Sequence, residues 1–386
     1  KNRTDSYGHY LFDSSSSWVK TGSTNGNGSY GGATGVFDGV SSTGFTVKSD
    51  FTGVNLLNKN YVSWTFRKAP KFFDVVTYSG NGTAGRTVSH NLGSVPGMII
   101  VKRTNSGADW TVYHRGVASD AETDAVFLNT KSAAGDHPSY WNDTAPTDTV
   151  FSVGNGSEVN SGSGTYVAYL FAHNDGDGEF GPDSDQDIIK CGNYAGNSSS
   201  NGPEIDLGFE PQFVLLRNTG WSNGQFIMYD SMRGIVNGTG GDQLLYPAQT
   251  YAESADTQIR VTSTGFKLES DNYDVNNNFN YIYMAIRRGS LFPPEAATEV
   301  FAPNFYGTSG YVGYLGAPAD MHMLGYRSGN SQNAITSSRM IQGNKALVTT
   351  SRAAEITTNS SWDNMSGVTT ASSTITTLIS WTWKRA

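Results

Sequence analysis

The chain has 386 residues, a formal net charge of −8 at pH 7, 45 glycines, 12% aromatic and 16% charged residues. The acidic balance argues against a nucleic-acid partner, no apolar run reaches the roughly 18 residues that a membrane-spanning helix needs, and the single cysteine, Cys191, leaves no disulfide within the chain. Abundant Gly, Ser, Thr and Asn, beside enough aromatic residues to build cores, predict an all-β fold rich in turns.

The first segment, residues 1–69, contains three short patterns typical of strands, separated by glycine-rich turns. They are His9–Ser15, Ser42–Val47 and Asn60–Lys68. In the last of them Trp64 and Phe66 have the same parity, so their side chains share one face of the expected closing strand.

The second segment, residues 72–174, places further strands ahead of the same patterns. Its distinctive feature is the pair Leu92-Gly93, followed by Pro96 and by an apolar run that ends in charged residues. Glycine supplies a turn with positive φ, proline fixes the next bend, and the apolar run enters a buried strand. Other strands are expected at Asp74–Tyr78, Asp109–Arg115, Asp148–Val153 and Thr165–Asn174.

The third segment, residues 187–288, repeats this order of signals. Leu207, Gly208 and Pro211 precede another apolar run, about 110 residues after the first. Strands are expected at Asp187–Lys190, Gln225–Arg233, Ser263–Leu268 and Asn280–Arg288. The same series of signals at a fixed spacing indicates an internal repeat.

The fourth segment, residues 299–386, is a divergent copy. Leu315, Gly316 and Pro318 form the turn with one residue fewer between glycine and proline, and Thr377–Arg385 is the closing strand. The four segments therefore predict four units, of which the last departs most from the pattern.

The first segment matches only the back of the repeat, with residues 1–8 in phase with the residues that begin at Val101 and at Leu216. We expect the front strands of this first unit to be missing or to be supplied by another chain. The alternative is a degenerate terminal copy, because repeat arrays often carry an atypical cap.

A unit of about 100 residues is long enough to fold by itself. The short strands, the turn residues and the lack of helical periodicity predict tandem β-sandwich repeats, jelly-roll-like and with little helix, each around a core of its own. The Leu-Gly-Pro turns are interpreted as punctuation before a strand and not as binding loops.

The connector between the second and third units is acidic and rich in glycine. Its closely spaced carboxylates suit a hard cation such as Ca²⁺, and the candidate ligands are Asp175, Asp177, Glu179, Asp183 and Asp185. The order of a calcium-binding loop is not present, so a solvated hinge is the competing interpretation.

Five tryptophans lie nearer to the expected loops than the paired aromatic residues of the closing strands do. An exposed indole can stack on a sugar or pack on a neighbouring subunit. The candidates for glycan or subunit contact are therefore Trp18, Trp110, Trp141, Trp221 and Trp362. The paired aromatic residues of the closing strands are assigned to core or subunit packing.

No pattern typical of catalysis is found, and the chain is predicted not to be an enzyme. The histidines lack the spacing of a metal site, and neither a nucleophile elbow nor a phosphate-binding loop occurs. His114 and Asp230 take equivalent positions in separate units, which argues against a Ser-His-Asp triad. No cofactor is expected apart from Ca²⁺ at the acidic connector.

The stretches "SGNGTAGRTVSHNLGSVPGMIIVKRT", "GTYVAYLFAHN" and "LGFEPQFVLLRN" resemble the tandem domain of unknown function of virion proteins from marine tailed bacteriophages, often labelled tail fibre or tail-associated proteins. The resemblance is dense in the second and third units and holds in outline elsewhere. It implies a structural protein located in the virion, with other copies of itself, other virion proteins and a host-surface glycan as partners. It supplies no catalytic residue.

Three functions stay open. A tail fibre or appendage predicts a large, repeated contact between chains, with one copy of each contact surface per protomer. A carbohydrate-binding or capsid-decorating module predicts an aromatic patch that binds glycan in an isolated unit. A glycan depolymerase predicts two acids facing each other across a groove.

Overall fold

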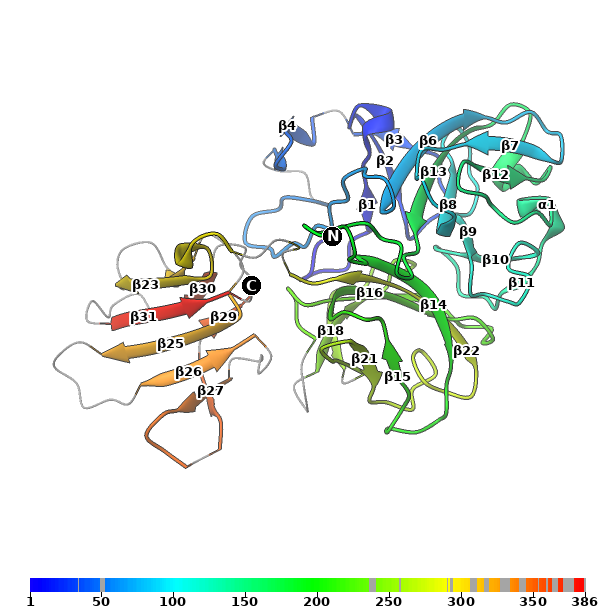
Figure 1. Ribbon diagram of the computed structural model, residues 1–386. Coiled ribbons are helices and arrows are strands. Elements are labelled where there is room, and N and C mark those ends of the chain that lie inside the picture. The colour runs from blue at the N-terminus through cyan, green and yellow to red at the C-terminus, as the bar shows by residue number, and fades with distance from the viewer. Residues whose placement is uncertain are drawn as a thin grey trace.

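The computed structural model describes residues 1–33, 35–48, 53–235, 241–256, 258–289, 291, 294–305, 311–315, 319–326, 334–339, 345–352, 354–358, 360–362, 367–370 and 378–384. Within them the protein is built of antiparallel sheets, with two short α-helices and two 3-10 turns, so the all-β prediction is confirmed (Figure 1). None of the helices in this part of the chain is long and apolar enough to cross a membrane.

The second unit is a six-stranded sheet covered by a two-stranded one. The large sheet has the order β11-β10-β9-β8-β13-β6, and the small one pairs β12 with β7. The bounds are β6 (Phe73–Ser79), β7 (Arg86–Ser89), β8 (Pro96–Arg103), β9 (Thr111–His114), β10 (Asp124–Phe127), β11 (Gly135–Asp136), α1 (Pro138–Trp141), β12 (Val150–Val153), α2 (Ser157–Asn160) and β13 (Thr165–Ala172).

The third unit repeats this arrangement. Its large sheet has the order β14-β22-β16-β17-β18-β19, and its small sheet has the order β15-β21-β20. The bounds are β14 (Ile189–Ala195), β15 (Glu204–Asp206), β16 (Pro211–Asn218), β17 (Phe226–Asp230), β18 (Asp242–Leu245), β19 (Ser254–Asp256), β20 (Ile259–Val261), β21 (Gly265–Leu268) and β22 (Asn280–Arg287). In both units the last long strand is inserted between the first strand and the one that follows the Leu-Gly-Pro turn.

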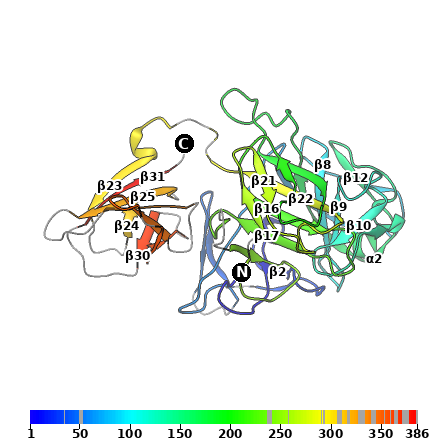
Figure 2. The same cartoon turned by 90° about the horizontal axis from the view of Figure 1, so that it is seen from below.

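The fourth unit has the same strand order, with sheets β23-β31-β25-β26-β27-β28 and β24-β30-β29. The bounds are η2 (Ala297–Glu299), β23 (Phe301–Phe305), β24 (Tyr311–Tyr314), β25 (Met321–Tyr326), β26 (Ile335–Ser338), β27 (Lys345–Val348), β28 (Ile356–Thr357), β29 (Ser360–Ser361), β30 (Gly367–Thr370) and β31 (Leu378–Trp383). It lies beside the other three units in both views (Figures 1 and 2). The division at the predicted boundaries stays a prediction, although the three strand orders agree with it.

The first unit is less complete. It contains β1 (Tyr10–Leu11), η1 (Ser14–Ser16), β2 (Lys20–Ser23), β3 (Gly31–Gly32), β4 (Phe37–Val40) and β5 (Phe45–Val47), in the sheets β1-β2-β3 and β4-β5. The predicted closing strand Asn60–Lys68 does not form, and only an isolated bridge joins Asn2 to Tyr61. The prediction is wrong because the described residues contain no strand to flank it as β6 and β8 flank β13.

One hydrophobic cluster joins the second and third units. It runs from Phe73 and Val101 to Phe213 and Met284, so the large sheet of the third unit is covered on both faces. Its other face packs on the small sheet of its own unit, where Phe266 is fully buried. The third unit therefore has the predicted core of its own between its two sheets, but the second and third units also share a core, which was not predicted. Continuous apolar runs such as those of β8 and β22 are consistent with strands buried on both faces of the sheet. A β-sandwich by itself buries only one face of each sheet.

Candidate functional site

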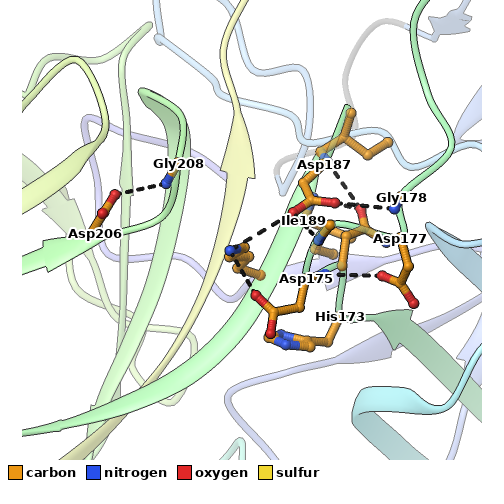
Figure 3. Close-up of polar contacts among 12 residues, drawn as sticks. His173, Asp175, Asp177, Gly178, Asp187, Ile189, Asp206 and Gly208 are labelled. Atoms are coloured by element: carbon orange, nitrogen blue, oxygen red, sulfur yellow. Dashed lines mark hydrogen bonds and ion pairs between the residues drawn. The ribbon is translucent and has the colours of Figure 1, made fainter. Parts of the chain in front are cut away.

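The Leu-Gly-Pro turns introduce the central strand of each large sheet. Gly93 has φ of 71° and Gly208 has φ of 74°, a left-handed conformation that glycine adopts without strain. The Asp206 carboxylate accepts a hydrogen bond from the Gly208 amide at 2.9 Å (Figure 3). Leu92 and Leu207 are fully buried below these turns.

After each turn a proline opens the strand. Pro96 is the first residue of β8 and Pro211 is the first residue of β16. In the fourth unit Leu315 is partly buried, while Gly316 and Pro318 lie outside the described residues. The turns at Gly93 and Gly208 therefore position the strands that follow them.

Lysines pair with two of the five candidate carboxylates of the acidic connector, those of Asp175 and Glu179. Figure 3 shows Asp175, Asp177 and Asp187 at this loop. Asp175 pairs with Lys190 at 3.2 Å, and this hydrogen bond lowers the pKa of the aspartate. The Asp187 carboxylate accepts hydrogen bonds from the amides of Gly176 and Gly178, at 2.8 and 3.1 Å. Asp187 thus closes the connector into a loop through main-chain contacts.

The remaining candidate ligands point to different partners. Glu179 pairs with Lys71 at 2.6 Å, Asp177 accepts a hydrogen bond from the Asp175 amide at 3.0 Å, and Asp183 and Asp185 are exposed. Among the described residues no three His, Cys, Asp or Glu side chains gather around one point. The calcium site stays a prediction, without a cluster in this part of the chain to hold the ion.

Hydrogen bonds at both ends of the connector argue against its interpretation as a solvated hinge. The Asn174 amide donates to the Ile189 carbonyl at 2.8 Å, and the Asn174 side chain accepts from the amides of Ile188 and Ile189. The Cys191 amide donates to Nδ1 of His173 at 3.2 Å. Both ends of the connector are therefore held in place, which limits swivelling between the second and third units.

Three of the candidate tryptophans are buried, so their predicted exposure is wrong. Trp110, Trp141 and Trp362 are 0%, 2% and 4% exposed. Trp141 packs edge-on against Tyr113 inside the second unit, and the Arg339 guanidinium lies 5.9 Å from the Trp362 ring. The residues that neighbour a tryptophan in the sequence do not show whether its loop covers a core or faces solvent.

The other two tryptophans are half-buried. Trp18 packs edge-on against Phe37 at 6.0 Å, and Trp221 lies 5.1 Å from Tyr273, a ring that is 49% exposed. The pair Trp221 and Tyr273 is thus the aromatic surface to which the glycan prediction can still apply.

Buried cations connect consecutive units. Lys102 and Arg217 occupy the same position of their sheets, opposite Val167 and Ile282 in register. Lys102 Nζ donates to the Asn27 carbonyl of the first unit at 3.0 Å, and burial lowers its pKa to about 8.

The corresponding arginine reaches from the third unit into the second. Arg217 donates to the carbonyls of Phe127 at 2.6 Å and Ser132 at 2.5 Å, with Thr130 at 3.4 Å. Its side chain is fully buried. Charge-assisted bonds of this kind are stronger than bonds between neutral groups.

A lysine of the first unit completes this series. Val62 and Lys1 exchange main-chain hydrogen bonds at 3.0 Å, so Lys1 takes the place that Lys102 has opposite Val167. The predicted phase, with Lys1 at the place of Val101, is therefore wrong by one residue. Lys1 Nζ donates to the Thr250 carbonyl of the third unit at 2.9 Å. A buried cation of the second unit thus bonds to the first unit, and one of the third unit bonds to the second. The cycle closes because Lys1 of the first unit bonds to the third.

Main-chain hydrogen bonds follow the same cycle. The Tyr30 amide donates to Thr104, the Ala134 amide to Thr219 and the Glu253 amide to Arg3, at 2.9, 2.7 and 2.9 Å. Each acceptor follows its unit's cation by two residues. The Arg3 guanidinium adds two hydrogen bonds to the Glu253 carboxylate, at 2.7 and 2.9 Å.

A third set of inter-unit contacts is made at the equivalent position of His114 and Asp230, which in the first unit is Asp13. Asp13 accepts a hydrogen bond from the Tyr169 hydroxyl at 2.5 Å, and Asp230 accepts one from Nε1 of Trp64 at 3.0 Å. His114, the equivalent residue of the second unit, lies 3.0 Å from the carbonyl of Tyr283.

The His114 ring is neutral in this setting. Burial lowers its pKa to about 4. Nδ1 accepts the Gly116 amide at 3.1 Å, which leaves the proton on Nε2 to donate to the Tyr283 carbonyl. The side chain thus serves as a fixed donor between the second and third units.

Aromatic rings fill the centre where the three units meet. Phe66 of the first unit lies 5.5 Å from Phe171 of the second and 6.4 Å from Phe213 of the third. Trp64 lies 6.3 Å from Phe213. The first three units therefore form a closed ring around an apolar centre, and the contacts permute as under a threefold rotation.

Sequence reasoning did not find this ring. A signal existed, because Lys102 and Arg217 are the next-to-last residues of equivalent strands, and Asp13, His114 and Asp230 are polar residues at one equivalent position. Periodicity identifies such positions, but their partners lie in another unit, at sequence separations that no local pattern covers.

A cleft of about 620 Å³ opens between the first and second units. Its walls are mostly hydroxyl groups, from Ser15, Ser16, Ser17, Tyr30, Thr77, Tyr78, Ser79, Thr104, Thr165 and Tyr166, with Lys20 at the side. At the equivalent place between the next two units, Asn193 donates to the Gly116 carbonyl at 2.9 Å. Thr77, the counterpart of Asn193, is too short to make that contact, so the cleft stays open.

The fourth unit touches the third through ions. Arg288 pairs with Glu210 at 2.8 Å and also with Asp320, and Arg339 reaches the Ser231 carbonyl at 3.5 Å. These groups join the end of β22 to the start of β25 and the end of β26.

Comparison with known proteins adds a family but no function. Residues 1–288 match a family model described as a domain of unknown function (DUF7483), a span that covers the first three units. No curated protein matches the chain. A solved structure, "Crystal Structure of the STIV MCP", is similar at 10% identity over 56% of this chain and 92% of that one, with a TM-score of 0.16. A TM-score this low carries no argument about fold or function.

Proposed function

This chain belongs to the family of the domain of unknown function DUF7483, and we propose that it is a structural protein of a virus particle. The finer proposal is a tail fibre or appendage of a bacteriophage, located in the virion, that serves assembly and attachment to a host-surface glycan. Its partners would be other copies of itself and other virion proteins. No catalytic step is part of this role.

The closed ring of three units is the observation that carries the proposal. Its buried polar groups, among them Arg217, His114 and Asp230, are engaged in contacts between units. Groups held in this way are unavailable to a substrate, and they fix the relative orientation of the units. Such an arrangement suits a rigid building block, whose task is to keep its shape under load.

The resemblance to tandem repeats of phage virion proteins supports the finer role. The turns and closing strands that carry it are the elements that build the two large sheets. The matching strand order of the second, third and fourth units fits a repeated module.

The experiment is to purify particles that carry this protein by density gradient and label them with gold-conjugated antibodies against the ring. We expect a fixed copy number per particle by quantitative mass spectrometry, and gold on an appendage in electron micrographs. Gold on the head would retain the structural role and reject the tail assignment. Absence of the protein from washed particles would reject both.

A glycan-binding module is the second candidate, favoured by the hydroxyl-lined cleft between the first and second units. Hydroxyl groups exchange hydrogen bonds with a polyhydroxylated ligand, although aromatic stacking usually adds affinity. A glycan array with the intact protein tests it, beside the variant Thr77→Trp, which fills the cleft, and Tyr273→Ala, which removes the aromatic surface. Binding lost only in Thr77→Trp would support the cleft, and released oligosaccharides would favour a depolymerase instead.

A further inference from the structure

The cleft between the first and second units exposes hydroxyl groups to solvent. Ser17, Thr77 and Ser79 line it, and within the described part of the chain their side-chain oxygens make no hydrogen bond to a protein group. The volume of about 620 Å³ lies within the range of about 300–1,000 Å³ that is usual for small-molecule sites. The cleft is therefore large enough for a ligand and offers it both donors and acceptors.

Positive charge lies at this cleft, although the chain as a whole has a net charge of −8. Lys20 lines the cleft and is exposed, and the residues that line it include no aspartate or glutamate. Arg86 donates to the carbonyl of Ser79, and its guanidinium lies 5.5 Å from the centre of the Tyr78 ring. Neither cation forms an ion pair with a carboxylate of the described residues. Cations without an acidic partner favour an anionic ligand.

Two residues distinguish this cleft from the closed interface between the second and third units. At the position of Thr77 the third unit has Asn193, whose side chain donates to the Gly116 carbonyl at 2.9 Å. Lys20 takes the position of Asp124, because β2 pairs with β1 in the same register in which β10 pairs with β9. The closed interface thus has an acid at this position, and the open one has a lysine.

We propose that this cleft binds an acidic saccharide, with a carboxylate or sulfate group of the sugar at Lys20 and sugar hydroxyls on the side chains of Ser17, Thr77 and Ser79. Hydroxyl side chains exchange hydrogen bonds with a sugar in both directions, and the lysine ammonium supplies a point charge for an oxyanion. The site rests on glycan attachment, the finer part of the proposed function, and specifies the class of glycan.

The test compares acidic oligosaccharides with neutral forms of the same molecules. Trigalacturonate, sialyllactose and a sulfated carrageenan oligosaccharide are titrated into the intact protein, each beside its methyl-esterified or desulfated form. We expect one acidic form to bind at a single site and its neutral form to bind at least about tenfold more weakly. Raising the salt from about 50 mM to about 500 mM should weaken the acidic form more, because salt screens an exposed charge.

Substitutions then assign the binding to the residues of the cleft. Lys20→Gln removes the charge and should weaken binding of the acidic form by about fivefold, with the neutral form unchanged. Thr77→Asn installs the residue of the closed interface, and Thr77→Trp fills the cleft, so each should reduce binding by at least about tenfold. Lys131→Gln, at an exposed lysine of the second unit, is the control and should change neither affinity nor melting temperature.

The possible results separate this site from the wider role. Equal affinity for acidic and neutral forms, or no binding of any acidic form, rejects the site, while the gold label on particles still decides the structural role. Binding that persists in both Thr77 variants and is lost in Tyr273→Ala places the glycan on the aromatic surface of the third unit and also rejects the site. Selective binding by a protein that is absent from washed particles would keep the site and reject the role in the particle.

Discussion

The interface between the first and second units and the interface between the second and third units use one design with different side chains. Arg217 donates to the carbonyls of Phe127 and Ser132, whereas Lys102 donates to those of Asn27 and Ala108. The Asn27 carbonyl also accepts the Ala108 amide at 2.8 Å, so it depends less on the cation.

This comparison shows that Lys102 and Arg217 both donate to main-chain carbonyls at their interfaces. A carbonyl is supplied by any residue, so the contact survives changes of sequence in the accepting loop, provided that the loop keeps its path. The cation is the sensitive partner, because its loss leaves buried carbonyls without a donor. The two interfaces should therefore respond unequally to the same substitution.

The largest effect is expected for Arg217→Met. It keeps much of the buried side-chain volume but leaves the carbonyls of Phe127 and Ser132 without donors, at a cost of about 3–5 kcal/mol. Calorimetry should show the melting temperature of the ring falling by roughly 10 °C. Arg260→Met, at a partly exposed arginine of the same unit, is the control and should shift it little.

The next effect is expected for Tyr169→Met, which installs the residue found at the equivalent position 284. The buried Asp13 carboxylate loses the Tyr169 hydroxyl, which should cost about 2 kcal/mol in the free energy of unfolding. Tyr273→Met, at a half-exposed ring, should change stability by under about 0.5 kcal/mol. Equal effects in the two variants would contradict the role given to the Asp13 contact.

A smaller and pH-dependent effect is expected for Lys102→Met, at about 1–2 kcal/mol near neutral pH. Burial lowers the Lys102 pKa to about 8, below the value of about 10.4 in an unfolded chain. Between these pH values the unfolded chain binds more protons, so the folded protein gains stability as pH rises. The stability gap between the wild type and Lys102→Met should therefore widen from pH 8 to pH 10.

The smallest effect is expected at the fourth unit, whose ionic contact is partly exposed. Asp320→Asn weakens the pairing with Arg288 by up to about 1 kcal/mol. Limited proteolysis between residues 289 and 299 should speed up by about threefold, with the melting temperature of the ring unchanged. The exposed Asp185→Asn is the control, and a fall in ring stability would show that the fourth unit supports the ring.

Strand positions were predicted well where local patterns are strong. The closing strands of the second and third units, and the turns at Gly93 and Gly208, lie where periodicity and turn chemistry placed them. The same reasoning failed for Asn60–Lys68, which has the pattern of a strand and no partner in the described residues. A strand needs neighbours to satisfy its backbone, and no sequence pattern reports whether they are present.

The candidate site was harder to predict. Trp110 was interpreted as an exposed contact, yet it stacks on Tyr169 and donates to carbonyls of the first unit. The acidic connector was a candidate for Ca²⁺, yet Lys71 and Lys190 hold its carboxylates. In both cases the partners come from distant parts of the chain, and their identity depends on which faces meet.

The sequence by itself determined that this protein is all-β and that one series of strands recurs along it, because turn chemistry and side-chain alternation are local properties. Only the tertiary structure decided that three units share an apolar centre and that a buried cation of each unit bonds to the next unit of the ring. That outcome depends on which of two apolar faces of each sheet meets another unit, a choice made by packing over long sequence distances and invisible to any local pattern.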